Sequence, residues 1–487
     1  MKRSNLLFIF LYSTILAHAQ SNSFQNEYDK FRHNAQKEYN DFRQKANQEY
    51  VEWIKKAWEW YSAVEPVPFP KDNMLPPIIY NKEQEQKKEK PTPIPFEEVV
   101  PTPSPEPQPK PIAPIRENKG DYFTISFTFF GTSGDVRLPK GDFFKINGHN
   151  ETAYATAWQE LSKRKYDNLM RDCLMLRMKH QLCDWAYLMM LGELANTICG
   201  KGTNEATMLQ AYLFCQSGYK IRLGLTKEKE LCLLFKSNHL IYDMTRFNLD
   251  DGVYYLLQPI DDDGLNICDI SYPEEKPLSL WITQEQKFAE RKSKERQLVP
   301  KNMQISIRSL VNENLLDFYS TYPTSMIGEN IVSRWAMYAR TPLSKSAKAI
   351  LYPQLKSLIS HADNATIAAN WLLYWVQTSF VYEYDDKVWG HDRAFFAEET
   401  LFYPFCDCED RSILFSRLVR DLLGLDVILV FYPGHLATAV AFNTAVEGDY
   451  IDLNGRRFTI CDPTYIGAPV GATMPDMNNK TAKVILL

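Results

Sequence analysis

The sequence predicts an α+β protein in which an amphipathic helix packs on an antiparallel sheet, preceded by a long N-terminal helix and a proline-rich linker. Near the C-terminal end, the apolar-periodic run 413–423 is stopped by Gly424, which is typical of a helix and its C-terminal cap. Three β-branched runs follow, at 427–432, 436–442 and 458–461, and they predict the strands of the sheet.

The first 19 residues have the pattern of a secretory signal peptide. Lys2 and Arg3 form a charged end, residues 6–16 are apolar, and Ala17-His18-Ala19 is a small-residue cleavage site. The apolar run is too short to span a bilayer, and no later run is long enough. We therefore expect an exported protein, periplasmic or secreted, without a membrane span.

Residues 20–64 are predicted to form one long amphipathic helix, because apolar residues recur in them every eleven positions. Tyrosines lie at 28, 39, 50 and 61, aromatic residues at 31, 42 and 53, and alanines at 35, 46 and 57. Steps of three, four and four place these side chains on one face of a helix, a pattern also found in coiled coils. This face predicts either self-association or a protein partner, and packing against the chain's own globular body is an equal alternative.

Residues 65–118 are predicted to be a proline-rich linker. Residues 66–114 hold 15 of the chain's 28 prolines, and 101–111 alternates proline with other residues. Such sequences adopt extended polyproline II structure and act as semi-rigid spacers. Order is expected again from residue 119, with a domain at 119–265, a connecting β-rich segment at 266–340 and a second domain at 341–487.

Candidate catalytic residues come from three places in the last domain. Cys408 stands at the start of the predicted helix, where the helix dipole and unpaired N–H groups favour a thiolate. His435 opens a predicted strand and Asp462 follows the next strand, with the same spacing of 27 residues each time. A nucleophile, a base and an orienting carboxylate in this order are the parts of a catalytic triad. Taken singly, each residue is more often structural, and Cys406 is a rival nucleophile.

These motifs resemble the transglutaminase-like superfamily of papain-like cysteine enzymes. The resemblance rests on Cys408-Glu409-Asp410-Arg411-Ser412, Gly424, His435 and Asp462-Pro463-Thr464, and it covers about the last third of the chain. It implies Cys408 as nucleophile, His435 as base and Asp462 as orienting acid, and it makes Gln377 a candidate oxyanion donor. Many members follow the histidine with an aromatic residue, where this chain has Leu436.

Residues 119–265 are predicted to be a degenerate second copy of the same unit. Counting back sixteen residues from Gly424 reaches Cys408, and the same count from Gly218 reaches Gly202. In this register Gln258 stands where Asp462 stands, and His239 marks the histidine strand. Such a copy lacks the nucleophile and the acid, so it would bind or brace.

The predicted function is an exported cysteine-dependent acyl-transfer enzyme acting on peptide or protein amides. A protease or amidase is favoured over a cross-linking transglutaminase, and a non-catalytic secreted adhesion or scaffold protein is the alternative. The net charge of −5 without a basic block gives no case for nucleic acid. No cofactor and no metal ligands are expected. The nine cysteines are expected to be mainly buried thiols.

Overall fold

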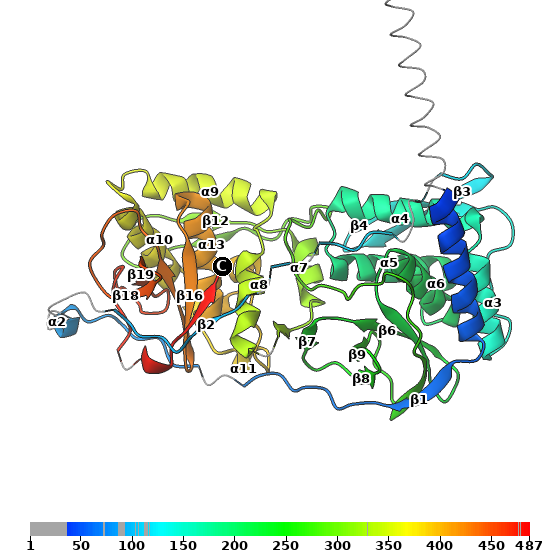
Figure 1. Ribbon diagram of the computed structural model, residues 1–487. Helices are drawn as coiled ribbons and strands as arrows, with labels where there is room; N and C mark the ends of the chain where they lie inside the picture. Colours follow the sequence, from blue (N-terminus) through cyan, green and yellow to red (C-terminus); the bar gives the residue numbers. More distant parts are fainter. Residues whose placement is uncertain are drawn as a thin grey trace, which may run out of the picture.

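The computed structural model shows a mixed α+β protein with mainly antiparallel sheets, as the sequence predicts. The described residues are 37–71, 74–85, 93–102, 104–105, 107–111, 115, 117–328, 330–475, 477 and 479–487. The predicted signal segment and the first part of the predicted N-terminal helix lie outside them. Two halves lie side by side, each with its own sheet and helices (Figure 1).

The N-terminal half contains a six-stranded sheet with the order β1-β10-β5-β6-β9-β8. Its strands are β1 (Trp58–Ser62), β5 (Ile221–Leu225), β6 (Leu231–Lys236), β8 (Arg246–Leu249), β9 (Gly252–Leu256) and β10 (Gly264–Cys268). The hairpin β3 (Tyr122–Phe129) and β4 (Thr132–Pro139) precedes the helices α3 (Glu151–Leu161), α4 (Asp167–His180), α5 (Asp184–Cys199) and α6 (Asn204–Gln216). Helix α6 packs on β5 and β6.

The C-terminal half contains a second six-stranded sheet with the order β2-β20-β16-β17-β19-β18. Its strands are β2 (Glu98–Val100), β16 (Val427–Tyr432), β17 (His435–Val440), β18 (Tyr450–Leu453), β19 (Arg456–Cys461) and β20 (Lys483–Leu486). The helices are α8 (Arg334–Arg340), α9 (Lys345–Ile359), α10 (Ala365–Ser379), α11 (Asp385–Val388), α12 (Ala397–Phe402) and α13 (Cys408–Leu423). Helix α13 packs on β16 and β17 and is contacted by α8, α10 and α12.

Shorter elements complete the two halves and the segment between them. Strands β7 (His239–Ile241) and β13 (Ser325–Ile327) form one pair, β11 (Arg296–Leu298) and β12 (Ile307–Ser309) a second, and β14 (Val381–Tyr382) and β15 (Phe405–Cys406) a third. Besides the helix at residues 37–54, the described part of the chain also contains α2 (Lys82–Glu85), α7 (Glu313–Ser320) and the 3-10 turns η1 (Arg164–Tyr166), η2 (Ile331–Ser333) and η3 (Asn479–Thr481). The segment 266–340 thus carries β11, β12 and β13 together with α7 and α8.

The two six-stranded sheets have the same strand order relative to the chain. In each, a helix leads into a central strand, the next strand pairs with it, and two further strands complete one side of the sheet. In each, a later strand returns to the other side of the first, and an N-terminal segment adds the outermost strand. The outermost strands differ in direction, because β1 is antiparallel to β10 whereas β2 is parallel to β20.

His239 does not occupy the place predicted for it in the first sheet. It lies in β7, which pairs with β13 outside the six-stranded sheet, and its Nε2 accepts a hydrogen bond from the Leu280 N–H at 3.3 Å. Burial lowers the pKa of His239 to about 4. The prediction was wrong because the hairpin β5–β6 is followed by an extra short strand before the sheet continues at β8.

The predicted N-terminal helix is shorter than expected. Residues 37–54 are helical, but Trp58–Ser62 forms strand β1 on the edge of the first sheet, so the prediction of a helix to residue 64 was wrong. The unpaired edge of β10 offers five residues of strand pairing, and this tertiary interaction overrides the helical pattern. Only part of the apolar stripe is buried: Ala46 and Tyr50 face the body, whereas Tyr39, Phe42 and Trp53 are exposed.

The proline-rich segment is bound to both halves over its described residues. Val67 bridges to Tyr242 in the first half, and Ile79 and Pro93 bridge to Ile466 and Tyr450 in the second. Strand β2 then joins the second sheet. Extended backbone between prolines keeps the N–H and C=O groups that a sheet edge can pair with. The described residues of this segment are therefore part of the folded body: the stretch after β1 runs along the lower edge of the molecule, and the chain later returns through β2 (Figure 1).

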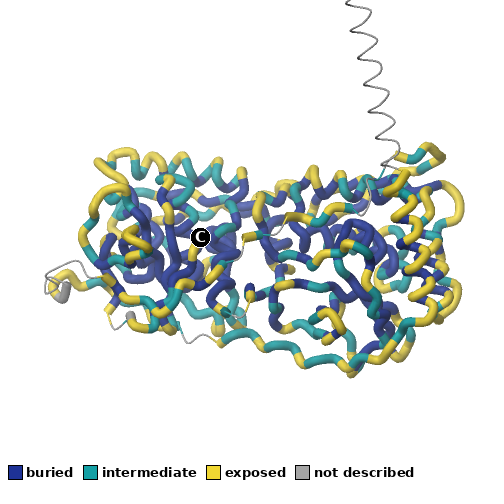
Figure 2. The backbone as a smooth tube through the Cα atoms, in the orientation of Figure 1, coloured by how far each residue is buried: buried dark blue, intermediate teal, exposed yellow. Residues whose placement is uncertain are grey.

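Buried residues are concentrated at the centre of each half, and exposed residues lie on the outer loops and helix faces (Figure 2). The largest hydrophobic cluster includes α5 and α6 in the first half and α10 and α13 in the second. None of the helices in the described part of the chain is long and apolar enough to cross a membrane.

Replacement of Tyr50 by alanine is expected to destabilise the protein by about 3 kcal/mol, because a buried aromatic ring is lost. Tyr50 is 3% exposed and its ring lies 4.7 Å from that of Trp158. Trp53→Ala is the matched control, since Trp53 is 44% exposed in the same helix, and it should change stability by less than about 1 kcal/mol. Denaturant unfolding measures both, and equal losses would show that the helix does not pack as described.

Candidate active site

Cys408 is the first residue of α13, as predicted. The side chain of Asp407 caps the helix by accepting hydrogen bonds from the N–H groups of Glu409 and Asp410, at 3.1 and 3.4 Å. The Asp410 carboxylate in turn accepts from the N–H of Asp407 at 3.2 Å, which completes a reciprocal cap. The helix start is thereby fixed, and Cys408 is fully buried within it.

His435 and Asp462 are joined directly. Nε2 of His435 lies 2.7 Å from Oδ2 of Asp462, and both side chains are buried. Oδ1 of Asp462 accepts from the N–H groups of Thr464 and Tyr465 at 2.9 and 3.2 Å, which fixes the carboxylate. With the Nε2 proton donated to Asp462, the Nδ1 atom carries the lone pair. Nδ1 is buried and has no hydrogen-bond partner among the described residues.

Helix α13 meets the start of β17 through two polar contacts. Ser412 Oγ donates to the carbonyl of Leu436 at 2.8 Å. The backbone N–H of Leu436 lies close enough to the Cys408 thiol to lower its pKa. Cys408 therefore lies beside the residue that follows His435, and Asp462 is also close enough to act on the thiol, so the three predicted residues lie in one place. A hydrogen bond between the thiol and His435 itself is not among those of the described residues.

A segment from the N-terminal side covers this site. Sδ of Met74 lies 3.6 Å from Sγ of Cys408, and the N–H of Leu75 donates to the carbonyl of Gly434 at 2.8 Å. Tyr382 Oη donates to the Leu75 carbonyl at 3.2 Å. We call residues 74–80 the cover segment, because its other end exchanges two backbone hydrogen bonds with Ile466. It thus spans from the loop before His435 to the loop after Asp462.

The cover segment changes the chemistry expected of Cys408. Burial raises the pKa of the Cys408 thiol well above its ordinary value, and Asp407 and Glu409 raise it further, whereas the Leu436 N–H lowers it. The expectation of a thiolate at the helix start is therefore wrong for this closed arrangement. Loss of hydration disfavours the anion more than the helix dipole favours it.

Gln377 is not available as an oxyanion donor. Its Nε2 donates to the carbonyls of Asp462 and Ala468, at 2.9 and 3.1 Å, and its Oε1 accepts from the Gly467 N–H at 3.0 Å. Both amide protons are thus used, and the side chain is 1% exposed. The prediction was correct that Gln377 lies near the site, but its bonds hold the loop that carries Asp462.

Cys406, the rival nucleophile, lies in β15 beside β14. Its Sγ is 3.8 Å from the carbonyl of Val381, and burial raises its pKa to about 11. All nine cysteines are unpaired, and eight of them are buried. Cys406 therefore resembles the other buried thiols of the chain in its surroundings.

Sequence reasoning missed two features of the site. Met74 lies 334 residues from Cys408 in the chain, and no local pattern indicates this contact. Asp385, Asp392 and Glu409 form a cluster of carboxylates beside the start of α13. Asp407, Glu409 and Asp410 are three acids in four positions, which is more than a helix cap requires, and this excess was a usable signal.

Comparisons with protein-family models, with curated proteins and with solved structures find no match to this chain.

Replacement of Met74 by glycine is expected to increase the rate at which iodoacetamide alkylates Cys408. The side chain removed is the one that contacts the thiol, and a loss of about 1.4 kcal/mol from the closed form raises the open population about tenfold. Mass spectrometry of the Cys408 peptide measures the rate. Ile79→Gly is the control, because Ile79 is 78% exposed in the same segment. An equal increase in both variants, or in neither, would contradict the role of Met74.

Replacement of Gln377 by alanine is expected to lower the free energy of unfolding by about 1–3 kcal/mol, because buried backbone groups lose their partners. Thermal and denaturant unfolding check this. An oxyanion donor would behave differently, since its loss reduces turnover and leaves stability unchanged. Gln354→Ala, at a half-buried amide that bonds to the Arg308 backbone, is the comparison and should cost less.

Proposed function

We propose that this chain is a cysteine-dependent acyl-transfer enzyme with a transglutaminase-like catalytic domain in residues 341–487. The observation that carries the proposal is the hydrogen bond between His435 and Asp462, together with the position of Cys408 beside Leu436, the residue that follows His435. The bond between His435 Nε2 and Asp462 assigns the basic lone pair to Nδ1. His435 is the first residue of β17, the strand on which α13 packs.

The proposed reaction begins with attack of the Cys408 sulfur on an amide carbonyl carbon. A C–S bond forms, and the thiol proton passes to Nδ1 of His435. His435⁺, stabilised by Asp462, then gives this proton to the leaving amine as the C–N bond breaks. A water molecule or a second amine attacks the thioester and releases Cys408. The N–H of Cys408, at the helix start, is the candidate donor to the oxyanion.

Hydrolysis of peptide or protein amides is the favoured outcome of this reaction, and cross-linking by amine transfer is the alternative within the same mechanism. We further propose that the protein is exported, on the pattern of residues 1–19. The unpaired cysteines do not oppose export, because the buried ones are shielded from oxidants.

We also propose that residues 119–265 are a degenerate copy of the catalytic unit. Ile221 pairs with Phe235 on the next strand, and Phe235 pairs in turn with Tyr255. In the second sheet Val427 pairs with Val440, and Val440 pairs in turn with Thr459. Gln258 lies three residues after Tyr255, and Asp462 lies three residues after Thr459, so the two occupy equivalent positions. The same alignment of the two sheets makes Glu230 equivalent to His435, and Gly202 equivalent to Cys408. Gly202, Glu230 and Gln258 all line a cavity of about 720 Å³, which supports a binding role for this copy.

A non-catalytic binding or scaffold protein is the second candidate. The observation that favours it is the closure of the site, since Cys408, His435 and Asp462 are at most 2% exposed and the pKa of the thiol is raised. Substrate could reach Cys408 only after the cover segment moves. The two candidates therefore differ in whether the opened site turns over.

Replacement of Cys408 by alanine in the Met74→Gly background is expected to reduce turnover roughly a thousandfold or more, because the nucleophile is removed. A peptide library with and without a fluorescent primary amine measures cleavage and amine incorporation. Cys406→Ser in the same background should keep substantial activity. Loss of activity in Cys406→Ser with retention in Cys408→Ala would reverse the assignment, and no turnover in either background would favour the scaffold role.

A further inference from the structure

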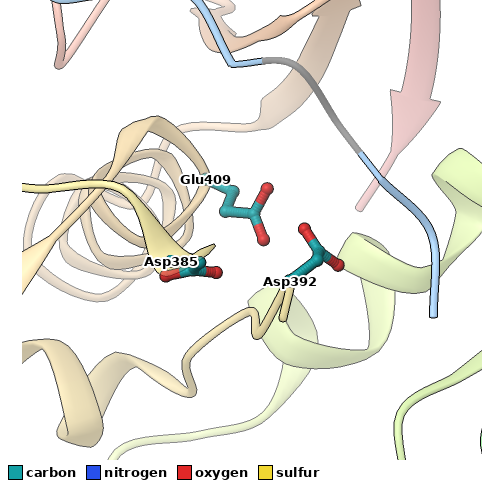
Figure 3. A group of neighbouring side chains, drawn as sticks. All are labelled: Asp385, Asp392 and Glu409. Carbon is teal, nitrogen blue, oxygen red and sulfur yellow. The ribbon is translucent and has the colours of Figure 1, made fainter. Parts of the chain in front are cut away.

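The carboxylates of Asp385, Asp392 and Glu409 converge beside the start of α13 (Figure 3). Asp385 begins α11, Asp392 lies in the following loop, and Glu409 is the second residue of α13. One oxygen from each lies within 4.8 Å of the others. In Figure 3 the Glu409 side chain extends from its helix towards the two aspartates.

Glu409 has the environment of a ligand without its ion. The residue is 0% exposed, and neither carboxylate oxygen has a hydrogen-bond partner among the described residues. A buried carboxylate needs a partner, because it has lost its hydration. Helix capping does not supply one, since Asp407 and Asp410 perform that task between themselves. The orphaned oxygens point instead into the cluster.

The charge around Glu409 is strongly negative. Four further carboxyl groups lie close enough to interact electrostatically with Glu409 or with one another: those of Asp385, Asp392, Asp407 and Asp410. The buried Arg334 pairs with Asp392, with a shortest distance of 2.6 Å, and is the cation that faces the cluster from α8. Arg393, from the loop before α12, is directed to Glu399 at 2.7 Å. One guanidinium does not balance this set of carboxylates.

The chemistry of these ligands selects a hard divalent cation. Carboxylate oxygens without sulfur or imidazole suit Ca²⁺ or Mg²⁺. The ligand oxygens lie within 4.8 Å of one another, a distance that two Ca–O bonds of about 2.3–2.6 Å each can span. Asp385 also accepts from the Arg393 N–H and Asp392 from Arg334, but each carboxylate has further lone pairs.

We propose that Asp385, Asp392 and Glu409 bind a divalent cation of the size of Ca²⁺, which fixes residues 385–392 to the first turn of α13. The site is independent of the proposed catalysis, because it uses neither Cys408 nor His435. It differs from the expectation that the chain has no metal ligands. Its function is positional: the ion holds the loop and the helix start together at the residue next to Cys408.

The test uses the full chain after dialysis against a chelator. Titration calorimetry with Ca²⁺ alone should give one bound ion per chain, and Ca²⁺ should raise the melting temperature. Glu409→Gln should weaken binding by roughly tenfold or more, since it removes a charged ligand of the same shape. Asp386→Asn is the matched control, because Asp386 is exposed beside the site, and it should bind as the wild type does.

Stability without metal gives a second readout. Glu409→Gln should melt at the same temperature as the metal-free wild type or higher, because the variant no longer buries an uncompensated charge. An absence of any ion-dependent shift in the wild type would overturn the proposal, as would an equal shift in Glu409→Gln. A shift with Mg²⁺ but not with Ca²⁺ would overturn the assignment of the ion. None of these readouts depends on turnover, so they fail separately from the proposed enzyme activity.

Discussion

The burial of the first turn of α13 against the start of β17 is the constraint on which the site depends. Residues 408–412 are at most 1% exposed, although four of them are polar or charged. Each buried polar group then requires a partner from elsewhere in the fold. Asp410 binds the Phe395 N–H, Arg411 binds the carbonyls of Gln377 and Phe380, and Ser412 binds Leu436. These bonds connect α10, the loop before α12 and β17 to one helix turn.

The local parts of this arrangement could be predicted from the sequence. Helical periodicity ending at Gly424 placed the start of α13 near Cys408, and Gly424 does adopt the left-handed conformation, with φ of 65°. Alternating and β-branched residues located β16, β17 and β19. Because β17 and β19 are neighbouring strands, their pairing brings His435 close to Asp462. The contact between them follows from the pairing of these two strands.

The parts that could not be predicted depend on contacts between distant segments. Trp58–Ser62 continues a helical pattern, yet the free edge of β10 draws it into a sheet. Gln377 was located correctly, but its role depends on three backbone groups of a loop about ninety residues away. The aspartates at 385 and 392 come from a stretch without periodicity, so nothing in the sequence places them beside Glu409. Local propensity does not contain this information.

The closed site rests on few interactions. The cover segment is held by a sulfur contact, by backbone bonds to Gly434 and Ile466, and by the hydroxyl of Tyr382. Segments with few contacts open at a small fraction of the free energy of global unfolding. Opening would rehydrate the Cys408 sulfur and remove the main cause of its raised pKa. The same movement would therefore expose Cys408 and increase the fraction of thiolate, and in the proposed enzyme it would also admit substrate.

The two outermost strands have a consequence for the order in which the chain acquires its structure. Strands β1 and β2 precede both sheets in the sequence, but their partners β10 and β20 are the last strands of each sheet in chain order. During synthesis each of these early segments emerges long before its partner exists. It must wait without pairing, and the prolines around β2 limit the wrong pairings it can make meanwhile. Each sheet is thus completed by a strand, β1 or β2, that is synthesised before the other strands of that sheet.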